Sequence, residues 1–503
     1  MILDDLAFEE KKDRAAGTLL GLLVGDALGR FAKYLIDMEG QSPSSEGFLQ
    51  RLSEVTDLQS VPTSMEALHI VEIAEEFQRH LAAVQLAVEE GHFGLESAHD
   101  NREAIAMAKY FVAKVDHPYR EAPFPKVLKE PSIQSWNKLT RILATVIPVS
   151  VFAAGDNFSN IFYFEKLLNW VNKDMQYHTK SITICQAALL LAELIAINCR
   201  KVSDIQQTHK RRYFAEQLVW SCPGLDPYMF HALNFEDYVD DPVFQRVRLD
   251  ERIVSLANAF RQYYMVKNFE SGLLETVAVG GDIQGNAAIC GAVLGATFGK
   301  SGIPSKWLPG DGPDTEIHGG HGLPAKERGE SAPKAEGGRK PRKRASAKAS
   351  HDANRVKPRN QPKLYREAER IALSLLISPV PKKEFIDDLK KRIDMVTGES
   401  RGKPKGEARG HGKSQAEDVE GIRALLQEKF IDLHYEENKW KYPIVFGDKK
   451  YSAYSLYEMA TFATYISGKK DNDPNIINSM AHDGYLNILV DRLNELYRHS
   501  RSV

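Results

Sequence analysis

Two glycine-patterned stretches, about 250 residues apart, decide the fold of this chain. The first runs from Gly17 to Gly29 (GTLLGLLVGDALG) and the second from Val277 to Gly299 (VAVGGDIQGNAAICGAVLGATFG). In the first stretch the glycines recur every four residues, so a helix would place all of them on one face. A face without side chains admits either a second helix or a ligand at close range. On this stretch alone, close helix packing is favoured over ligand binding.

The second stretch combines a tight turn with a helix of small residues. Gly280 and Gly281 precede Asp282, and the helix that follows would point its first backbone N–H groups toward the turn. A carboxylate beside these N–H groups is typical of a site for a phosphate or for a metal-bound water. The alternative is that Asp282 is only the N-cap of the helix. The turn by itself does not decide between them.

The sequence around these stretches is helical, which predicts an all-α domain. From residue 15 to about 308, apolar residues recur every three or four positions, as in Met65–Val88 and Ser181–Asn198. The most apolar run, Ala187–Ile197, is about half the ~20 residues that a membrane span needs, and Glu193 interrupts it. We therefore expect a buried core helix there and no contact with a membrane.

Composition narrows the class of protein further. The chain has 503 residues, a formal charge of -2, 43% hydrophobic residues and 27% charged residues, which is the balance of a soluble globular protein. That charge excludes a general polycation built for nucleic acid. The four cysteines are far apart in the sequence, and the acidic N-terminus lacks the pattern of a signal peptide. The expected location is intracellular, in the cytoplasm.

Changes in composition predict the organisation of the chain. We expect a helical domain over residues 12–308, a basic disordered insert over 309–361, a helical hairpin over 362–396, a polar linker over 397–415 and a small, mostly helical region over 416–503. In an alternative, the domain closes with a helix at 364–377 and the insert is a long surface loop. Within the last region, helices are predicted over residues 416–428, 455–466 and 484–499, and residues 440–454 are predicted to form a β-hairpin.

The insert concentrates the positive charge of the chain. Between Pro324 and Lys363 the basic residues outnumber the acidic ones by nine. A run such as Arg339–Arg344 is of the kind that makes a weak nucleic-acid contact or serves as a localisation patch. A merely solvated linker is the favoured alternative, and the absence of aromatic residues from 310–361 gives no support to base stacking.

The two glycine stretches, in this order and at this separation, resemble the ADP-ribosylglycohydrolase family, which includes the dinitrogenase-reductase-activating glycohydrolases. The family's Gly-Asp-Ala-x-Gly helix matches Gly17–Gly29, and its Gly-Gly-Asp ending matches Gly280 onward. Its Ile-Pro-x-x-Trp-Leu segment matches Ile303–Leu308, and its apolar proline segment and Thr/His helix start resemble Val146–Phe152 and His178. The resemblance covers about three fifths of the chain and implies an all-α fold.

The resemblance also implies two Mg²⁺ ions that orient ADP-ribose and a water, and most of their ligands are missing here. In the family's Thr-Asp-Asp-Thr motif Thr63 remains, whereas Ser64 and Met65 replace the acidic pair. In the second motif Asp282 remains, but Gln284 replaces the other aspartate. Because Mg²⁺ prefers several carboxylate oxygens, a binuclear site is not expected, and Thr63 and Asp282 are its remnants. A shifted alignment could bring Glu66 or Asp57 into the site.

The resemblance further suggests the residues that meet the ligand. They are Gly25, Asp26, Lys33, His178, Gly280, Gly281 and Asn286. Lys33 stands where many family members have a glutamate, so its ammonium could balance a diphosphate once held by metal, and a solvent-directed lysine is the alternative. For Asp26 we favour a bracing role over chemistry. His178 is equally consistent with a helix cap.

Three hypotheses for function follow. The first is a protein that binds ADP-ribose or a related nucleotide with metal-dependent hydrolysis weakened or lost. The second is an active hydrolase that removes ADP-ribose from proteins through an altered site containing Asp282. The third is a scaffold that acts through the region after residue 415. The partners expected are ADP-ribose or an ADP-ribosylated protein.

Overall fold

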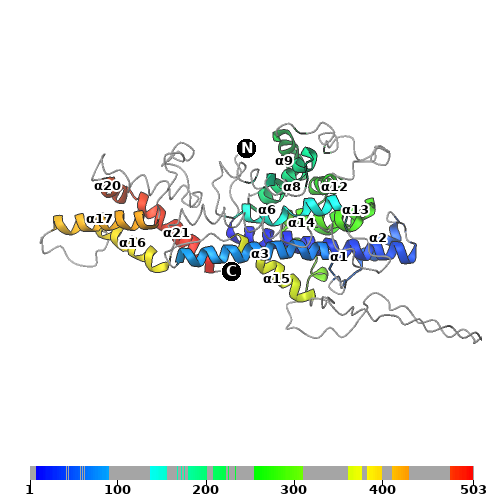
Figure 1. Cartoon of the computed structure of the whole chain (residues 1–503), viewed down its shortest axis with the longest axis horizontal. Coiled ribbons are helices and arrows are strands. Elements are labelled where there is room, and N and C mark those ends of the chain that lie inside the picture. The colour runs from blue at the N-terminus through cyan, green and yellow to red at the C-terminus, as the bar shows by residue number, and fades with distance from the viewer. Residues whose placement is uncertain are drawn as a thin grey trace, which may run out of the picture.

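The computed structural model describes eleven stretches of the chain and a few isolated residues between them. The stretches are residues 7–40, 45–56, 63–89, 136–155, 179–200, 208–222, 254–309, 361–376, 382–398, 411–429 and 476–501. Every regular element within them is a helix, which confirms the all-α prediction for the described part of the chain (Figure 1). The helices form two hydrophobic cores, one large and one small.

The large core joins helices from the first 376 residues. These are α1 (Phe8–Glu39), α2 (Glu46–Ser53), α3 (Met65–Glu89), α5 (Lys138–Ala144), α6 (Ile147–Ala153), α8 (Ile182–Arg200), α9 (Thr208–Ser221), α12 (Val254–Met265), α13 (Phe269–Val279), α14 (Ile283–Phe298) and α15 (Gln361–Leu375), with two short 3₁₀ helices, η4 (Lys300–Gly302) and η5 (Ser305–Trp307). The sequence predicted α3 and α8 within one or two residues of these bounds.

The two glycine stretches are the centre of the large core, where α1 and α14 lie antiparallel and almost in backbone contact. A Cβ atom at Gly21 would overlap the carbonyl oxygen of Gly291, and one at Gly29 would lie 2.6 Å from the Cα of Gln284. Gly17 and Gly25 meet the backbone of α14 in the same way. Glycine therefore serves close helix packing at all four positions. The ligand role suggested for Gly25 is not what the structure indicates, because α14 fills the space in front of it.

The Ile-Pro-x-x-Trp-Leu segment fastens the end of this domain. The Trp307 side chain is fully buried, its Nε1–H donates to the carbonyl oxygen of Val55 at 3.0 Å, and its ring meets Phe269 edge to face. Lys306 donates to Glu270 and to the carbonyl oxygen of Ser53. The segment therefore joins α2 to α13 and acts in folding rather than at the site.

Helix α8 crosses the interior of the large core. By length and composition it could span a membrane, and it is the only helix among the described residues that could. Its side chains from Ala187 to Ala196 are all buried against the other helices. It is therefore the buried core helix that the sequence predicted. Glu193 is part of this buried run, and burial raises the pKa of its carboxyl group to about 8.

Replacing Glu193 by glutamine is expected to change how stability depends on pH. The raised pKa means that the folded chain holds the proton of Glu193 between pH 4.5 and about 8, whereas the unfolded chain has released it. The wild type should therefore lose stability as pH rises through this range, on the order of a few kcal/mol, and Glu193→Gln should not. Urea unfolding at pH 5 and pH 9 measures this. Glu9→Gln, at an exposed position, is the control, and equal losses in all three proteins would contradict the prediction.

Helix α15 returns to the large core although more than 50 residues separate it from Leu308. Its buried residues, including Leu364, Ile371 and Leu375, join the large core, and the helix packs on α1 and α3. Lys300 and Glu369 form an ion pair at 2.7 Å that adds a polar contact. These contacts favour the alternative in which the domain closes with residues 364–377.

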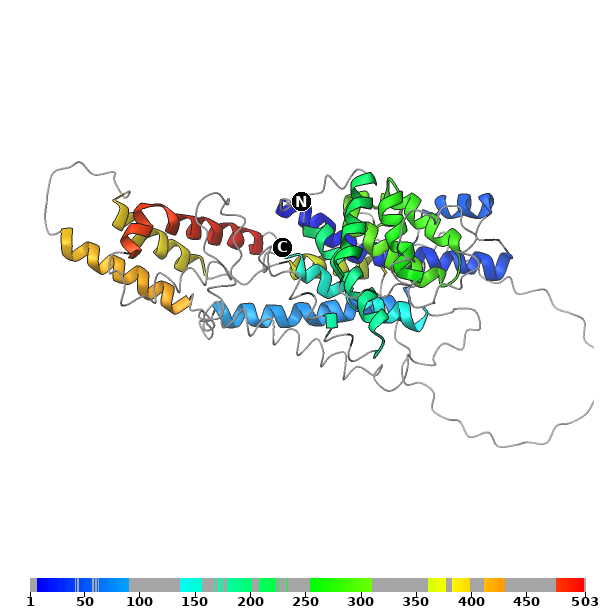
Figure 2. The ribbon, with the colours of Figure 1, turned by 90° about the horizontal axis from the view of Figure 1, so that it is seen from above.

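The predicted hairpin over 362–396 is wrong, although both of its helices exist. Helix α16 (Lys383–Thr397) packs with α17 (His411–Lys429), α20 (Ile476–His482) and α21 (Tyr485–Arg501) in the small core. Each of these three partners is thus farther from α16 along the sequence than α15 is. These four helices lie together at one end of the molecule in both views (Figures 1 and 2). The sequence showed two amphipathic helices but not that each has different partners.

The structure also adjusts the boundaries of the C-terminal elements. Helix α17 begins at His411, inside the linker predicted over 397–415, and α21 agrees with the prediction. Near the end of α21, the His499 ring stacks on Phe8 of α1 at 3.7 Å between ring centroids. The insert, the β-hairpin predicted over 440–454 and the helix predicted over 455–466 lie outside the described residues.

Candidate functional site

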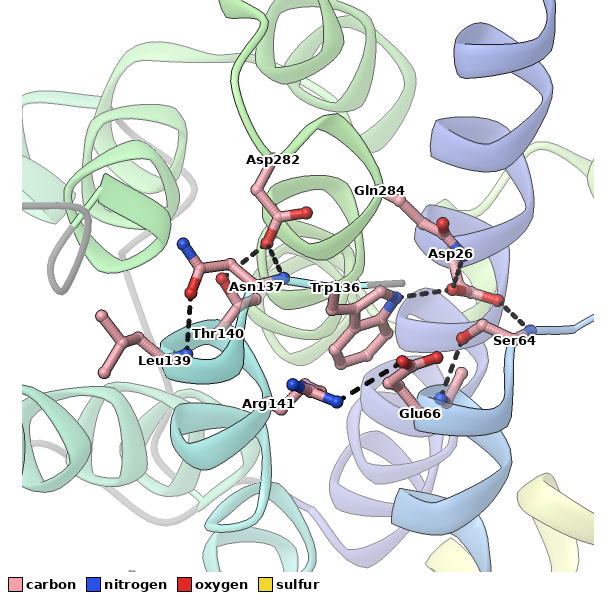
Figure 3. A network of polar contacts seen from close by, with 11 residues as sticks. Asp26, Ser64, Glu66, Trp136, Asn137, Leu139, Thr140, Arg141, Asp282 and Gln284 are labelled. Atoms are coloured by element: carbon pink, nitrogen blue, oxygen red, sulfur yellow. Dashed lines mark hydrogen bonds and ion pairs between the residues drawn. The ribbon is translucent and has the colours of Figure 1, made fainter. Parts of the chain in front are cut away.

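The site lies where α1, the start of α3, the start of α5 and the start of α14 meet (Figure 3). Asp26 of α1 is fully buried and accepts three hydrogen bonds of 2.8 Å. Trp136 Nε1 and Gln284 Nε2 donate to its Oδ1, and the backbone N–H of Ser64 donates to its Oδ2. A buried carboxylate needs such donors to remain charged away from water. Asp26 is therefore a brace between four segments of the chain.

Two of these donors stand at positions where the family resemblance implies acidic residues. Gln284 stands in place of an aspartate, and its amide points a hydrogen at Asp26 where a carboxylate would point a second negative charge. Ser64 replaces another acidic residue, and its Oγ accepts from the backbone N–H of Ala67 in the first turn of α3. Both substitutions thus turn acidic positions into neutral ones that support Asp26 and α3.

Asp282 is held by a second set of donors. As the N-cap of α14, it accepts from the backbone N–H of Gly285 at 3.3 Å. The backbone N–H of Asn137 and the hydroxyl of Thr140 both donate to its Oδ2 at 2.8 Å. The N-cap interpretation is therefore confirmed. Asp282 also binds the start of α5 to the start of α14.

A buried chain of hydroxyl and amide groups continues from Thr140. Its Oγ1 lies 2.8 Å from Oγ of Ser255, which donates to Oδ1 of Asn286 at 2.7 Å. Asn286 Nδ2 in turn reaches the carbonyl oxygen of Gly280 at 3.5 Å. Asn286, suggested as a ligand contact, is fully buried and supports the Gly280 turn from behind.

An almost buried ion pair joins the start of α3 to α5 (Figure 3). Glu66, in the first turn of α3, is 3.9 Å from Arg141 of α5, and both side chains are almost buried. Glu66 therefore belongs to the site, as a shifted alignment allowed. Its negative charge faces the guanidinium group of Arg141.

The remaining suggested residues are placed as follows. Lys33 lies one helical turn beyond Gly29, is partly exposed and forms an ion pair with Asp37 at 3.1 Å. Gly280 and Gly281 have φ angles of 82° and 70°, and a Cβ at Gly280 would meet nothing within 4 Å. Among the described residues, nothing therefore fills the space in front of Gly280. Thr63 is buried beside Ser64, and His178 lies outside the described residues.

The geometry does not fit a pair of magnesium ions. A cation needs lone pairs of several oxygens, whereas the lone pairs of Asp26 and Asp282 face N–H and O–H groups whose positive ends would repel it. In the part of the chain that the structure describes, no group of three or more His, Cys, Asp or Glu side chains is placed to hold a metal ion. We therefore assign no reaction step to a metal.

Sequence reasoning missed four residues of this site: Trp136, Asn137, Thr140 and Arg141. Their partners are more than 70 residues away along the chain, and nothing in their own spacing points to Asp26, Asp282 or Glu66. One usable signal was a tryptophan followed by asparagine, a common N-cap, directly before a helix. The loss of acidic residues at three positions was the other signal, since Asp26 then required different partners.

Comparisons with known proteins find one family match that contains both glycine stretches. The ADP-ribosylglycohydrolase family matches residues 8–318. An uncharacterized protein of Archaeoglobus fulgidus is 30% identical over 138 residues, which are 26% of this chain and 42% of that protein. An ADP-ribosyl-[dinitrogen reductase] glycohydrolase of Rhodospirillum rubrum is 37% identical over 54 residues, 11% of this chain and 18% of that protein. The matches thus span less than half the length of either relative.

A solved structure described as an ADP-ribosylglycohydrolase-related protein complex is also similar. It shares 17% sequence identity with this chain, covers 73% of it and 98% of its own length, and has a TM-score of 0.38. Because the family match covers more than half of the chain, the protein belongs to the ADP-ribosylglycohydrolase family.

Proposed function

We propose that this protein binds ADP-ribose, or a nucleotide related to it, without metal-dependent hydrolysis. The observation that carries the proposal is the set of hydrogen bonds that the two retained aspartates accept. Asp26 and Asp282 both accept at least two hydrogen bonds of 2.8 Å from protein donors, so both carboxylates have hydrogen-bond partners without a cation. The open turn at Gly280 and Gly281 keeps backbone groups accessible at the end of the site where a ligand can approach.

The hydrolase alternative receives less support from the same contacts. A hydrolase needs a group that orients or deprotonates the attacking water. Asp282 is the only retained aspartate with an exposed part, and its oxygens already accept from Gly285, Asn137 and Thr140. Glu66 faces Arg141 instead of an open space. Incubation with peptides ADP-ribosylated on arginine or serine should therefore release no ADP-ribose.

The scaffold hypothesis gains one specific observation. Helices α16, α17, α20 and α21 share a hydrophobic core of their own, as expected for a separately folded unit. A deletion of residues 416–503 would cut through this core, because α16 would remain without its partners. A deletion that begins at residue 382 removes the unit cleanly and is the better test of partner binding through it.

Thermal unfolding with ADP-ribose tests the binding proposal. A ligand present at about 100 times its Kd stabilises the folded state by about 2.7 kcal/mol, so the melting temperature should rise. We expect the same rise with Mg²⁺ and with a chelator, because no cation takes part in binding. A rise that requires Mg²⁺, or no rise in either buffer, would contradict the proposal.

Two matched variants of the Lys33–Asp37 ion pair locate the diphosphate. Lys33→Met and Asp37→Asn both break the pair, but only the first removes the ammonium group. If Lys33 contacts the diphosphate, Lys33→Met should weaken ADP-ribose binding about tenfold while Asp37→Asn leaves it unchanged. Equal affinities of the two variants for ADP-ribose would mean that Lys33 does not contact the diphosphate.

A further inference from the structure

Two consecutive residues, Trp136 and Asn137, touch both retained aspartates of the site. Trp136 is 1% exposed, and its indole Nε1–H donates to Oδ1 of Asp26 at 2.8 Å. The backbone N–H of Asn137 donates to Oδ2 of Asp282, also at 2.8 Å. Asn137 is in addition the N-cap of α5, and its Oδ1 accepts from the backbone N–H of Leu139. Figure 3 shows the Trp136 indole directed at Asp26 and the backbone nitrogen of Asn137 directed at Asp282.

Neither of these two groups can accept a hydrogen bond. An indole N–H and a backbone N–H can only donate, so each directs a fixed positive end at its carboxylate. A divalent cation would need the same lone pairs and would meet these hydrogens at close range. Gln284 adds a third donor on Asp26. Protein donors therefore take up lone pairs of Asp26 and Asp282 that a cation would need.

We propose that the Trp136–Asn137 pair is an internal strap that takes the structural role of a metal ion at this site. It links α1 and α14 through their aspartates and sets the start of α5 against both. Trp136 is thus a positioning residue, which acts through Asp26 and not on a substrate. The inference rests on the proposed metal-independent site, and its test uses divalent ions alone, so that it can fail while nucleotide binding succeeds.

The strap predicts which substitutions create a metal site. Trp136→Phe removes the N–H and keeps the ring, and Gln284→Asp exchanges a donor for a second carboxylate beside Asp26. The full-length wild-type chain should bind neither Mn²⁺ nor Mg²⁺ saturably in calorimetric titration at millimolar concentration. The double variant should gain affinity for Mn²⁺ by at least about tenfold, and its melting temperature should rise with the ion.

Trp307→Phe is the matched control. It also removes a buried indole hydrogen bond, the one to the carbonyl oxygen of Val55. This hydrogen bond involves neither Asp26 nor Asp282. A loss of stability alone should accompany it, with Mn²⁺ binding as weak as in the wild type. Metal binding gained in this control would show that loosening of the fold, and not removal of the strap, explains the double variant.

Two results would overturn the strap. One is saturable Mn²⁺ binding by the wild type that Asp26→Asn abolishes, and the other is a folded double variant that binds Mn²⁺ no better than the wild type. If the double variant does not fold, the wild type decides. Its Trp136 indole N–H should stay protected from solvent exchange in both Mg²⁺ and chelator, whereas protection lost on addition of Mg²⁺ would refute the proposal.

Discussion

Replacing Gly25 by alanine is expected to prevent the large helical domain from folding. The added Cβ would overlap the carbonyl oxygen of Ala287 and lie 2.9 Å from the Cα of Ala288. Both atoms belong to the backbone of α14, which cannot rotate away as a side chain could. The two central helices would have to separate and lose packing along their length. We expect a loss above about 4 kcal/mol, measured by urea unfolding or, if no folded protein is obtained, by the soluble yield.

Gly47→Ala is the control for this prediction. Gly47 lies in α2, and a Cβ there would meet nothing within 4 Å. The same substitution should leave stability unchanged or raise it by up to about 1 kcal/mol, since alanine favours the helix. Because Gly25 was also a suggested ligand residue, folding separates the two roles. A Gly25→Ala variant that folds normally but fails to bind ADP-ribose would restore the ligand role and contradict our assignment to packing.

The part of the fold that the sequence predicted is the part recorded in local spacing. Four glycines at intervals of four residues indicate a close helix contact. The structure, and not the spacing, identifies α14 as the partner. The apolar period predicted α3 and α8 for the same reason. The small core was not predicted, because amphipathicity shows that a helix needs a partner and not which one it has. The pairing of α16 with α17 and α21 instead of α15 is a property of the folded chain.

The acidic residues missing from the family's motifs said more about the candidate site than the residues that remain. The neutral residues at 64 and 284 indicated that metal ligands were missing, and this conclusion agrees with the hydrogen bonds of Asp26. The other hydrogen-bond donors of Asp26 could not be predicted. The indole of Trp136 approaches Asp26 across 110 positions of sequence, and no local pattern encodes that contact. Lys33 was suggested because it stands where many family members have a glutamate, whereas Arg141, which is almost buried, is the residue that pairs with Glu66.

Replacing Asp26 by asparagine is expected to cost about 3 to 5 kcal/mol of unfolding free energy, although the two side chains have nearly the same shape. The carboxylate accepts from Trp136, Gln284 and the N–H of Ser64. An amide offers one oxygen, and its NH₂ group would face at least one of these donors. The variant thus loses the charge that strengthens each hydrogen bond and leaves a buried donor without an acceptor. Urea unfolding followed by circular dichroism measures the loss.

The loss should be the same in Mg²⁺ and in chelator, and this equality separates a brace from a metal ligand. If Asp26 held a cation, the chelator would destabilise the wild type and leave Asp26→Asn almost unchanged, so that the difference between them would shrink. Asp37→Asn, which exchanges the same groups in the partly exposed ion pair with Lys33, should cost no more than about 1 kcal/mol. An Asp26→Asn variant as stable as Asp37→Asn would mean that the three donors find other acceptors, and the strap of Trp136 and Asn137 would lose its anchor on α1.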